Sequence, residues 1–246
     1  MDTSERNPVS KTLRALSLMV EQGTPQIGVR QLAGAMKIAP SSAHRILAAL
    51  AEAGFVRRDS GSQRYALTAE FFRVSQRAAA MSPLRCAGLA ALRPLVDACG
   101  ESALLGVYDE VRHEMLYAAA VEAPHAARNA IRMNEWLPVR AGASGLAILA
   151  FLDEAERHSA IAHAGLTQSL DGELAAVRRH GFAYTRCQWV AGAVGLAAPI
   201  FDRRGKVMGD VCVTIPQGRD QDGGKERLVD AMRRCVEDIT SRMRAA

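Results

Sequence analysis

The chain has 246 residues, of which 49% are hydrophobic and 23% charged, so it is long enough for two domains and can bury a sizeable core. It contains no apolar run of 18 residues and no charged-then-apolar leader, which predicts a cytoplasmic protein without a membrane span. The five cysteines form no C-x-x-C pair and the histidines show no metal-ligand spacing, so we expect reduced thiols and neither a disulfide framework nor a metal site.

The net charge of +5 comes from the first third of the chain. Residues 1–80 hold 11 Lys and Arg against 6 Asp and Glu, whereas residues 81–246 hold 20 of each sign. Nine of the eleven basic residues are arginines, which bind phosphate and guanine in a bidentate manner better than lysines do. A basic excess confined to one segment fits nucleic-acid binding or a merely solvated basic surface, and the elements that carry the arginines decide between the two.

The first predicted element is a helix over residues 10–20, which ends at Gly23-Thr-Pro25. Its apolar face is expected to pack behind the elements that follow. The residues on that face are Leu13, Leu16, Met19 and Val20.

Two short apolar helices follow at residues 28–36 and 41–50, joined by a tight turn and stopped by Gly54. Residues 55–67 then contain two short alternating runs around Asp59-Ser-Gly-Ser62, the pattern of a small hairpin. Two helices, a tight turn and a basic hairpin predict a winged helix-turn-helix domain.

The second of these helices begins with side chains that suit DNA. Hydroxyls near a helix N-terminus can hold phosphate, and Arg45 can reach a base edge or a phosphate. The alternative is that Ser41 is only an N-cap and Arg45 a surface charge. Arginines of the hairpin are further candidates for phosphate contact. The predicted DNA-binding residues are Ser41, Ser42, His44, Arg45, Arg57, Arg58 and Arg64.

The remainder of the chain alternates between strands and helices. Thr68 is the predicted N-cap of a linker helix, and a further helix covers residues 84–99. Strands are expected at residues 102–108, 114–121, 128–132, 182–185, 195–201 and 207–215, and helices at 143–152, from 153 onward, at 171–180 and at 222–244. This order predicts an α+β domain that is large enough to hold a small ligand.

Blocks of sequence in both halves resemble the IclR family of bacterial transcriptional regulators. The N-terminal blocks are Pro40-Ser-Ser-Ala-His-Arg-Ile-Leu-Ala-Ala-Leu50, Gly54-Phe-Val-Arg-Arg58 and Arg64-Tyr-Ala-Leu67. The C-terminal blocks are Leu137-Pro-Val-Arg-Ala-Gly-Ala-Ser-Gly-Leu-Ala-Ile-Leu-Ala150, His180-Gly-Phe182 and Gly195-Leu-Ala-Ala-Pro-Ile-Phe-Asp202. The resemblance implies a winged helix-turn-helix at 1–68, a linker helix at 69–83, and a GAF-like effector-binding and oligomerisation domain at 84–246.

The resemblance also implies partners. Members of this family bind palindromic operators in double-stranded DNA as dimers or dimers of dimers, and many respond to small carboxylates or aromatic acids. We therefore expect a ligand-responsive regulator that is not an enzyme and needs no cofactor. The alternative is a small-molecule-binding or enzymatic α+β domain whose basic winged-helix module contacts protein. The confinement of the basic excess to residues 1–80 favours the regulator.

The segments that contact ligand in the family imply an effector-binding set in this chain. It consists of Leu137, Arg140, Gly142, Ala143, Ser144, Thr185, Gln188, Ala193, Gly195, Cys212 and Thr214. Backbone N–H groups in residues 142–145 could hold an anionic oxygen at a helix start, and a close-packed turn without ligand is the alternative. A Gly-x-Ser-x-Gly nucleophile elbow is excluded because Leu146 follows Gly145.

Four departures from the family pattern bear on the effector. Arg140 replaces the usual histidine, Leu146 replaces a lysine, residues 185–188 replace an acidic stretch, and Gly195 replaces a cysteine. The loss of negative charge and the gain of Arg140 favour an anionic ligand. Gly195 is expected to leave room, and Trp136 or Trp189 to offer an aromatic face. The sequence thus predicts a carboxylate with an apolar or aromatic body.

Overall fold

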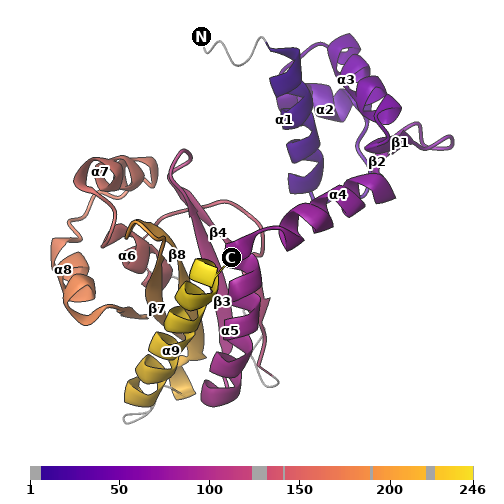
Figure 1. Ribbon diagram of the computed structural model, residues 1–246. Coiled ribbons are helices and arrows are strands. Elements are labelled where there is room, and N and C mark those ends of the chain that lie inside the picture. The colour runs from indigo at the N-terminus through magenta and orange to yellow at the C-terminus, as the bar shows by residue number, and fades with distance from the viewer. Residues whose placement is uncertain (1–6, 124–131, 141, 189–190, 220–224, 246) are drawn as a thin grey trace. The chain divides into compact units, whose positions relative to one another are not determined.

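A computed structural model describes residues 7–123, 132–140, 142–188, 191–219 and 225–245 (Figure 1). The chain divides into two compact units, Met1–Met81 and Ser82–Ala246, and each is described by itself. None of the described helices is long and apolar enough to cross a membrane.

The first unit is a winged helix-turn-helix, as the sequence predicts. Its elements are α1 (Pro8–Glu21), α2 (Val29–Met36), α3 (Pro40–Glu52), β1 (Val56–Arg58), β2 (Tyr65–Leu67) and α4 (Ala69–Ala80). The turn between α2 and α3 passes through Lys37 in the left-handed conformation, with φ of 54°. The strands β1 and β2 are antiparallel and form the hairpin, or wing. Thr68 accepts a hydrogen bond from the Phe71 amide and is the N-cap of α4, as predicted.

The apolar face predicted for α1 is only partly correct. Ala15 and Met19 are buried, whereas Leu13 is 60% exposed and Val20 51% exposed. The buried stripe runs through positions four residues apart, Ala15 and Met19, and therefore faces the core formed with α2 and α3. Leu13 and Val20 lie beside that stripe, so the first unit does not cover them.

The second unit is built on one six-stranded antiparallel sheet in the order β5-β4-β3-β8-β7-β6. Its strands are β3 (Ser102–Asp109), β4 (Glu114–Val121), β5 (Leu137–Pro138), β6 (Ala183–Arg186), β7 (Ala193–Phe201) and β8 (Val207–Pro216). The two-residue strand β5 was not predicted because it is too short to show a periodic pattern. The strand predicted at 128–132 falls mostly outside the described residues, and Arg132 is not in a strand.

Helices cover both faces of this sheet and define two separate cores. One face packs against α5 (Pro83–Cys99) and α9 (Lys225–Ala245), and the short 3-10 helix Gln217–Arg219 follows β8. The other face packs against α6 (Ala143–Leu149), α7 (Glu154–His163) and α8 (Asp171–His180). This α+β arrangement was predicted, although α6 ends at Leu149 rather than at residue 152.

The strands β3 and β8 approach each other closely at two glycines. A Cβ atom at Gly209 would lie 2.1 Å from the carbonyl oxygen of Gly106, so no side chain fits there. A Cβ atom at Gly106 would lie 1.9 Å from Oδ1 of Asp210. The carboxyl of Asp210 therefore occupies the space that Gly106 leaves free, on the α6 side of the sheet with Cys212.

Candidate functional site

The helix α3 presents polar side chains on its solvent side. Ala43 and Leu47 are buried at a spacing of four residues, so Ser41, His44 and Arg45 are exposed and Ser42 is half-buried. The N-cap is Ala39, which makes no side-chain cap, and Pro40 occupies the first helical position. The alternative that Ser41 is the N-cap is therefore wrong. No described residue forms an ion pair with Arg45.

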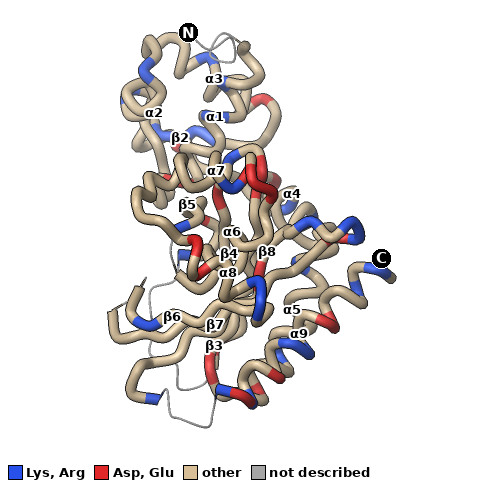
Figure 2. Tube along the Cα trace, turned by 90° about the vertical axis from the view of Figure 1, so that its left-hand side faces the viewer, with Lys and Arg blue, Asp and Glu red and all other residues tan. Residues whose placement is uncertain are grey.

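The wing carries the other predicted arginines in two different settings. Arg57 and Arg58 are exposed on β1, whereas the Arg64 Nη2 donates to the Gln26 carbonyl at 2.9 Å and to the Gln31 side chain at 2.7 Å. Two donors of Arg64 are thus used to hold the wing against the start of α2. Figure 2 colours the Lys and Arg positions of the chain trace blue.

The turn of the wing is held by a carboxylate. Asp59 accepts hydrogen bonds from the Ser62 amide and hydroxyl, both at 2.7 Å, and these bonds lower the pKa of Asp59. Arg57 lowers it further. Asp59 thus fixes the turn of the wing. The exposed Arg57 and Arg58, on the strand before it, give the wing its positive charge.

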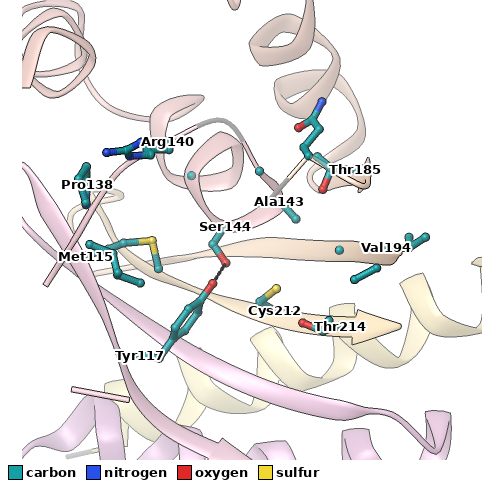
Figure 3. A pocket seen from close by; sticks show the side chains of 16 residues that line it. Met115, Tyr117, Pro138, Arg140, Ala143, Ser144, Thr185, Val194, Cys212 and Thr214 are labelled. Atoms are coloured by element: carbon teal, nitrogen blue, oxygen red, sulfur yellow. Dashed lines mark hydrogen bonds between the residues drawn. The ribbon is translucent and has the colours of Figure 1, made fainter. Parts of the chain in front are cut away.

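The second unit contains a cleft of about 590 Å³, part of which is open to solvent (Figure 3). All eleven residues that the sequence assigns to effector binding line the cleft. The lining also includes Gly145, which the sequence analysis named only for its backbone, and four residues that it missed, namely Met115, Tyr117, Pro138 and Val194. Met115 and Tyr117 lie two residues apart on β4, so strand alternation could have placed them together, but the apolar run after Tyr117 concealed which face was inward.

The deep part of the cleft is polar but shielded from water. The Tyr117 and Ser144 hydroxyls form a hydrogen bond of 3.0 Å, in which either can be the donor (Figure 3). Ser144, Thr185 and Cys212 are 6%, 7% and 5% exposed, respectively. Burial raises the pKa of Cys212 to about 12, so its thiol stays protonated at neutral pH. Burial also raises the pKa of Tyr117 well above its usual value. The Tyr117 hydroxyl therefore stays neutral and, like that of Ser144, can donate or accept a hydrogen bond.

Arg140 is exposed at the edge of the cleft, after β5. No described residue forms an ion pair with it, so the described part of the chain offers no structural salt bridge for this guanidinium. Its own carbonyl oxygen lies 1.7 Å from where a Cβ atom of Gly145 would stand. Gly145 is thus required for close packing of the turn, as the alternative for residues 142–145 supposes.

Two expectations about the shape of the cleft need correction. A Cβ atom at Gly195 would lie 2.9 Å from Cβ of Ala143, so this glycine lets α6 approach β7 and does not leave free room. Trp136 is not among the residues that line the cleft, and the Arg112 guanidinium lies over its ring, 4.9 Å from the ring centroid. Trp189 lies outside the described residues. Among the described residues of the lining, Tyr117 supplies the aromatic ring.

A buried acid lies next to the polar end of the cleft. Asp210 is 0% exposed, and neither of its oxygens has a hydrogen-bond partner among the described residues. Burial raises the pKa of Asp210 to about 7. The Ser144 hydroxyl opposes this rise but does not reach hydrogen-bond geometry. Sequence alone could not identify this group, since a single Asp within an apolar strand is more often read as an exposed residue.

The described residues contain no cluster of three or more His, Cys, Asp or Glu side chains that could hold a metal ion. The polar side chains that line the cleft carry hydroxyls, a neutral thiol, the Gln188 carboxamide and one guanidinium. This set suits the binding of an organic molecule through hydrogen bonds and charge.

Comparison with known proteins covers both units. Residues 8–60 match the family described as "IclR helix-turn-helix domain", and residues 76–241 match "Bacterial transcriptional regulator IclR C-terminal". The chain is 30% identical over 238 residues to the glycerol operon regulatory protein of Streptomyces griseus, covering 92% of each.

Two solved structures share the fold. An IclR transcriptional regulator from Alicyclobacillus acidocaldarius has a TM-score of 0.82 at 22% identity, covering 96% of this chain and 98% of that one. An IclR homologue from Microbacterium hydrocarbonoxydans, complexed with 4-hydroxybenzoate, has a TM-score of 0.81 at 20% identity, covering 98% and 100%.

The buried Asp210 predicts a specific pH dependence of stability. Its pKa is about 7 in the folded chain, whereas an unfolded Asp titrates near 3.9. Below pH 4 the carboxyl is neutral in both the folded and the unfolded state, so its ionisation does not lower the free energy of unfolding. Between about pH 4 and pH 7 the unfolded state ionises first, so the wild type should lose up to about 1.4 kcal/mol of stability per pH unit relative to Asp210→Asn. Above pH 7 the difference stays constant.

Urea unfolding followed by tryptophan fluorescence measures this difference, because both tryptophans lie in the second unit. Asp238→Asn is the control, since Asp238 is only half-buried on α9 and pairs with Arg242. If the free energy of unfolding changed with pH in the same way for the wild type and Asp210→Asn, the pKa of Asp210 would be the same in the folded and unfolded states.

Proposed function

The chain belongs to the IclR family of bacterial transcriptional regulators, and we propose that it binds a palindromic DNA operator as a dimer and responds to an organic acid. The observation that carries this proposal is the combination of two sites. Exposed arginines stand on α3 and the wing of one unit, and a cleft with a guanidinium at its edge and hydroxyls in its depth lies in the other.

The DNA-binding part of the proposal rests on α3 and β1. Arg45 is exposed on the helix that follows the turn, where a helix-turn-helix protein presents its base-reading side chains. Arg57 and Arg58 are exposed on the wing and suit the phosphate backbone. Arg64 contributes by holding the wing in place, since two of its donors already bind α2 and its preceding segment.

The effector part of the proposal rests on the chemistry of the cleft. Arg140 without an ion-pair partner among the described residues offers a charge-assisted hydrogen bond to a carboxylate. The remaining wall is largely apolar, with Met115, Leu137 and the ring of Tyr117 available for the body of the ligand. The 4-hydroxybenzoate complex of the Microbacterium homologue supports an aromatic acid as one member of this class.

The dimer part of the proposal rests on uncovered apolar side chains in the first unit. No residue of α4 is buried, and Phe72 is 63% exposed. Leu13 and Val20 of α1 are also more than half exposed. An amphipathic helix with uncovered apolar side chains favours self-association. A single recognition helix contacts few bases, so a two-fold dimer also provides the specificity that an operator requires.

We predict that Arg45→Ala lowers the affinity for the operator by about 1–3 kcal/mol if Arg45 reads a base. If it contacts only a phosphate, affinity falls evenly across sequences and the salt slope shrinks by about one unit. The measurement is fluorescence anisotropy on duplexes selected from a random-sequence pool. Arg242→Ala on α9 of the other unit is the control. Unchanged affinity and salt slope would place Arg45 outside the interface, and wild-type binding insensitive to salt would favour the alternative function in protein contact.

We predict that the purified protein has twice the 26.4 kDa chain mass, or four times if dimers pair, in light scattering at micromolar concentration. Phe72→Glu should shift it toward the monomer, because a charge on the uncovered face of α4 opposes its burial. Val111→Glu is the control, since Val111 is 86% exposed on a turn in the other unit. A monomeric wild type would contradict the dimer, and an unaffected Phe72→Glu would exclude α4 from its interface.

We predict that carboxylates stabilise the protein in a thermal-shift screen and that Arg140→Ala removes most of this effect, because the guanidinium pairs with the ligand anion. The screen compares pyruvate, benzoate and 4-hydroxybenzoate with the neutral benzamide. Arg242→Ala on the surface of α9 is the control. Stabilisation by benzamide alone, or acid binding unchanged in Arg140→Ala, would refute the role of Arg140.

A further inference from the structure

The strand β4 contains one residue more than its pairing with β3 uses. In this antiparallel pairing, Leu105 of β3 lies opposite Ala119. The next residue of β3, Gly106, lies opposite Tyr117, so Ala118 between the two has no partner. Such an extra residue is a β-bulge, and bulges next to ligand sites commonly change the direction in which a side chain points.

The bulge decides which side of the sheet Tyr117 faces. Met115 and Tyr117 pack on the α6 side of the sheet. Ala119 and Val121 follow at the same spacing but pack on the opposite side, against α5 and α9. Without the extra residue, all four positions would face one side, because side chains alternate along a strand. The bulge thus directs the Tyr117 hydroxyl toward Ser144 in the cleft while the rest of β4 packs against α5.

A side chain of α5 binds the bulge. The Nε of Arg85 donates a hydrogen bond of 3.2 Å to the carbonyl of the extra residue, Ala118. Gly88 lies one turn further along α5, and a Cβ atom there would lie 2.6 Å from Cδ2 of Leu105. Leu105 is the residue of β3 at which the register shifts. The first half of α5 is therefore fixed to the bulge by a hydrogen bond and by close packing.

Arg85 also lies at the beginning of the second unit. The boundary between the units falls between Met81 and Ser82, and α5 starts at Pro83. The Ser82 hydroxyl caps α5 by accepting a hydrogen bond of 3.4 Å from the Arg85 amide. The main chain of Arg85 thus binds the cap that follows the boundary, and its side chain binds the bulge beside Tyr117.

We propose that Arg85 is a positioning residue through which the effector cleft controls the start of α5 and, along the chain, the DNA-binding unit. The inference rests on the proposed response to an acid and names the route of that regulation. Strand pairing is interrupted at the bulge, so this point of β4 can shift with the least loss of hydrogen bonds. A ligand that contacts Tyr117 binds one arrangement of the bulge more tightly than another, and Arg85 passes this preference to the first turn of α5.

The test compares the operator affinity with and without an acid in the wild type and in Arg85→Met. The substitution keeps most of the aliphatic stem and removes the guanidinium donors. Fluorescence anisotropy is measured on the selected duplexes with saturating benzoate, 4-hydroxybenzoate or pyruvate. At least one acid should change the wild-type operator affinity about fivefold or more, and in Arg85→Met this change should fall to within about twofold.

Two controls separate this role from a merely structural one. Arg85→Met should still bind DNA without acid, and acid without DNA in calorimetry, because Arg85 contacts neither. Arg93→Met, at an exposed position of the same helix, should keep the wild-type change in operator affinity. If Arg85→Met does not fold, Arg85→Lys replaces it in the comparison. Lys keeps a charged donor on a long stem, so part of the wild-type change should remain.

Hydrogen exchange in the wild type tests the same route without a substitution. A bound acid should slow amide exchange in the cleft at residues 143–149 and alter it at residues 85–88, but not at residues 93–99. An effect at 143–149 with none at 85–88, or a wild-type change in operator affinity in Arg85→Met, would overturn the role of Arg85 alone. If no acid alters exchange in the cleft, or none alters the wild-type operator affinity, the proposed response to acids is wrong and this inference falls with it.

Discussion

The close approach of α6 to the central sheet is the constraint on which the cleft depends. All seven residues of this helix are buried, so it can lie only where both its backbone and its side chains fit tightly. Gly195 allows β7 to pass beneath Ala143, and Gly145 allows the Arg140 carbonyl to pass beside the helix. This approach brings Ser144 over Tyr117 and places Arg140 at the edge of the same cleft (Figure 3).

The same constraint creates an electrostatic cost. Between α6 and the sheet there is little water to solvate polar atoms, so the hydroxyls of Tyr117 and Ser144 satisfy each other. The Asp210 carboxyl has no such partner within the described residues. An apolar side chain at position 210 would have packed beside Gly106 without this cost. Unsatisfied buried groups are expensive, and their retention at a ligand site is typical of function favoured over stability.

The sequence predicts the elements well and the contacts between them poorly. Periodicity located α8 and β4, and residue type located the N-cap of α4, because these features depend on local residue order. The resemblance to the IclR family supplied the eleven lining residues. Tyr117 and Asp210 were missed because their importance depends on which strand faces α6, a tertiary property. The role of Gly195 was wrongly predicted for the same reason. A glycine that permits close packing and a glycine that opens a cavity look alike in sequence.

Both proposed ligands are anions, but the two units attract them by different physical means. Residues 1–80 carry the whole net positive charge, and the arginines of α3 and β1 are exposed, so a long-range field and counterion release suit a polyanion such as DNA. Residues 81–246 have no net charge, so a small acid gains little from the field of that unit. Its recognition must come from groups at contact distance, namely one guanidinium and oriented hydroxyls in a poorly hydrated cleft. In such a poorly hydrated cleft each hydrogen bond to the ligand is electrostatically stronger than it would be in water.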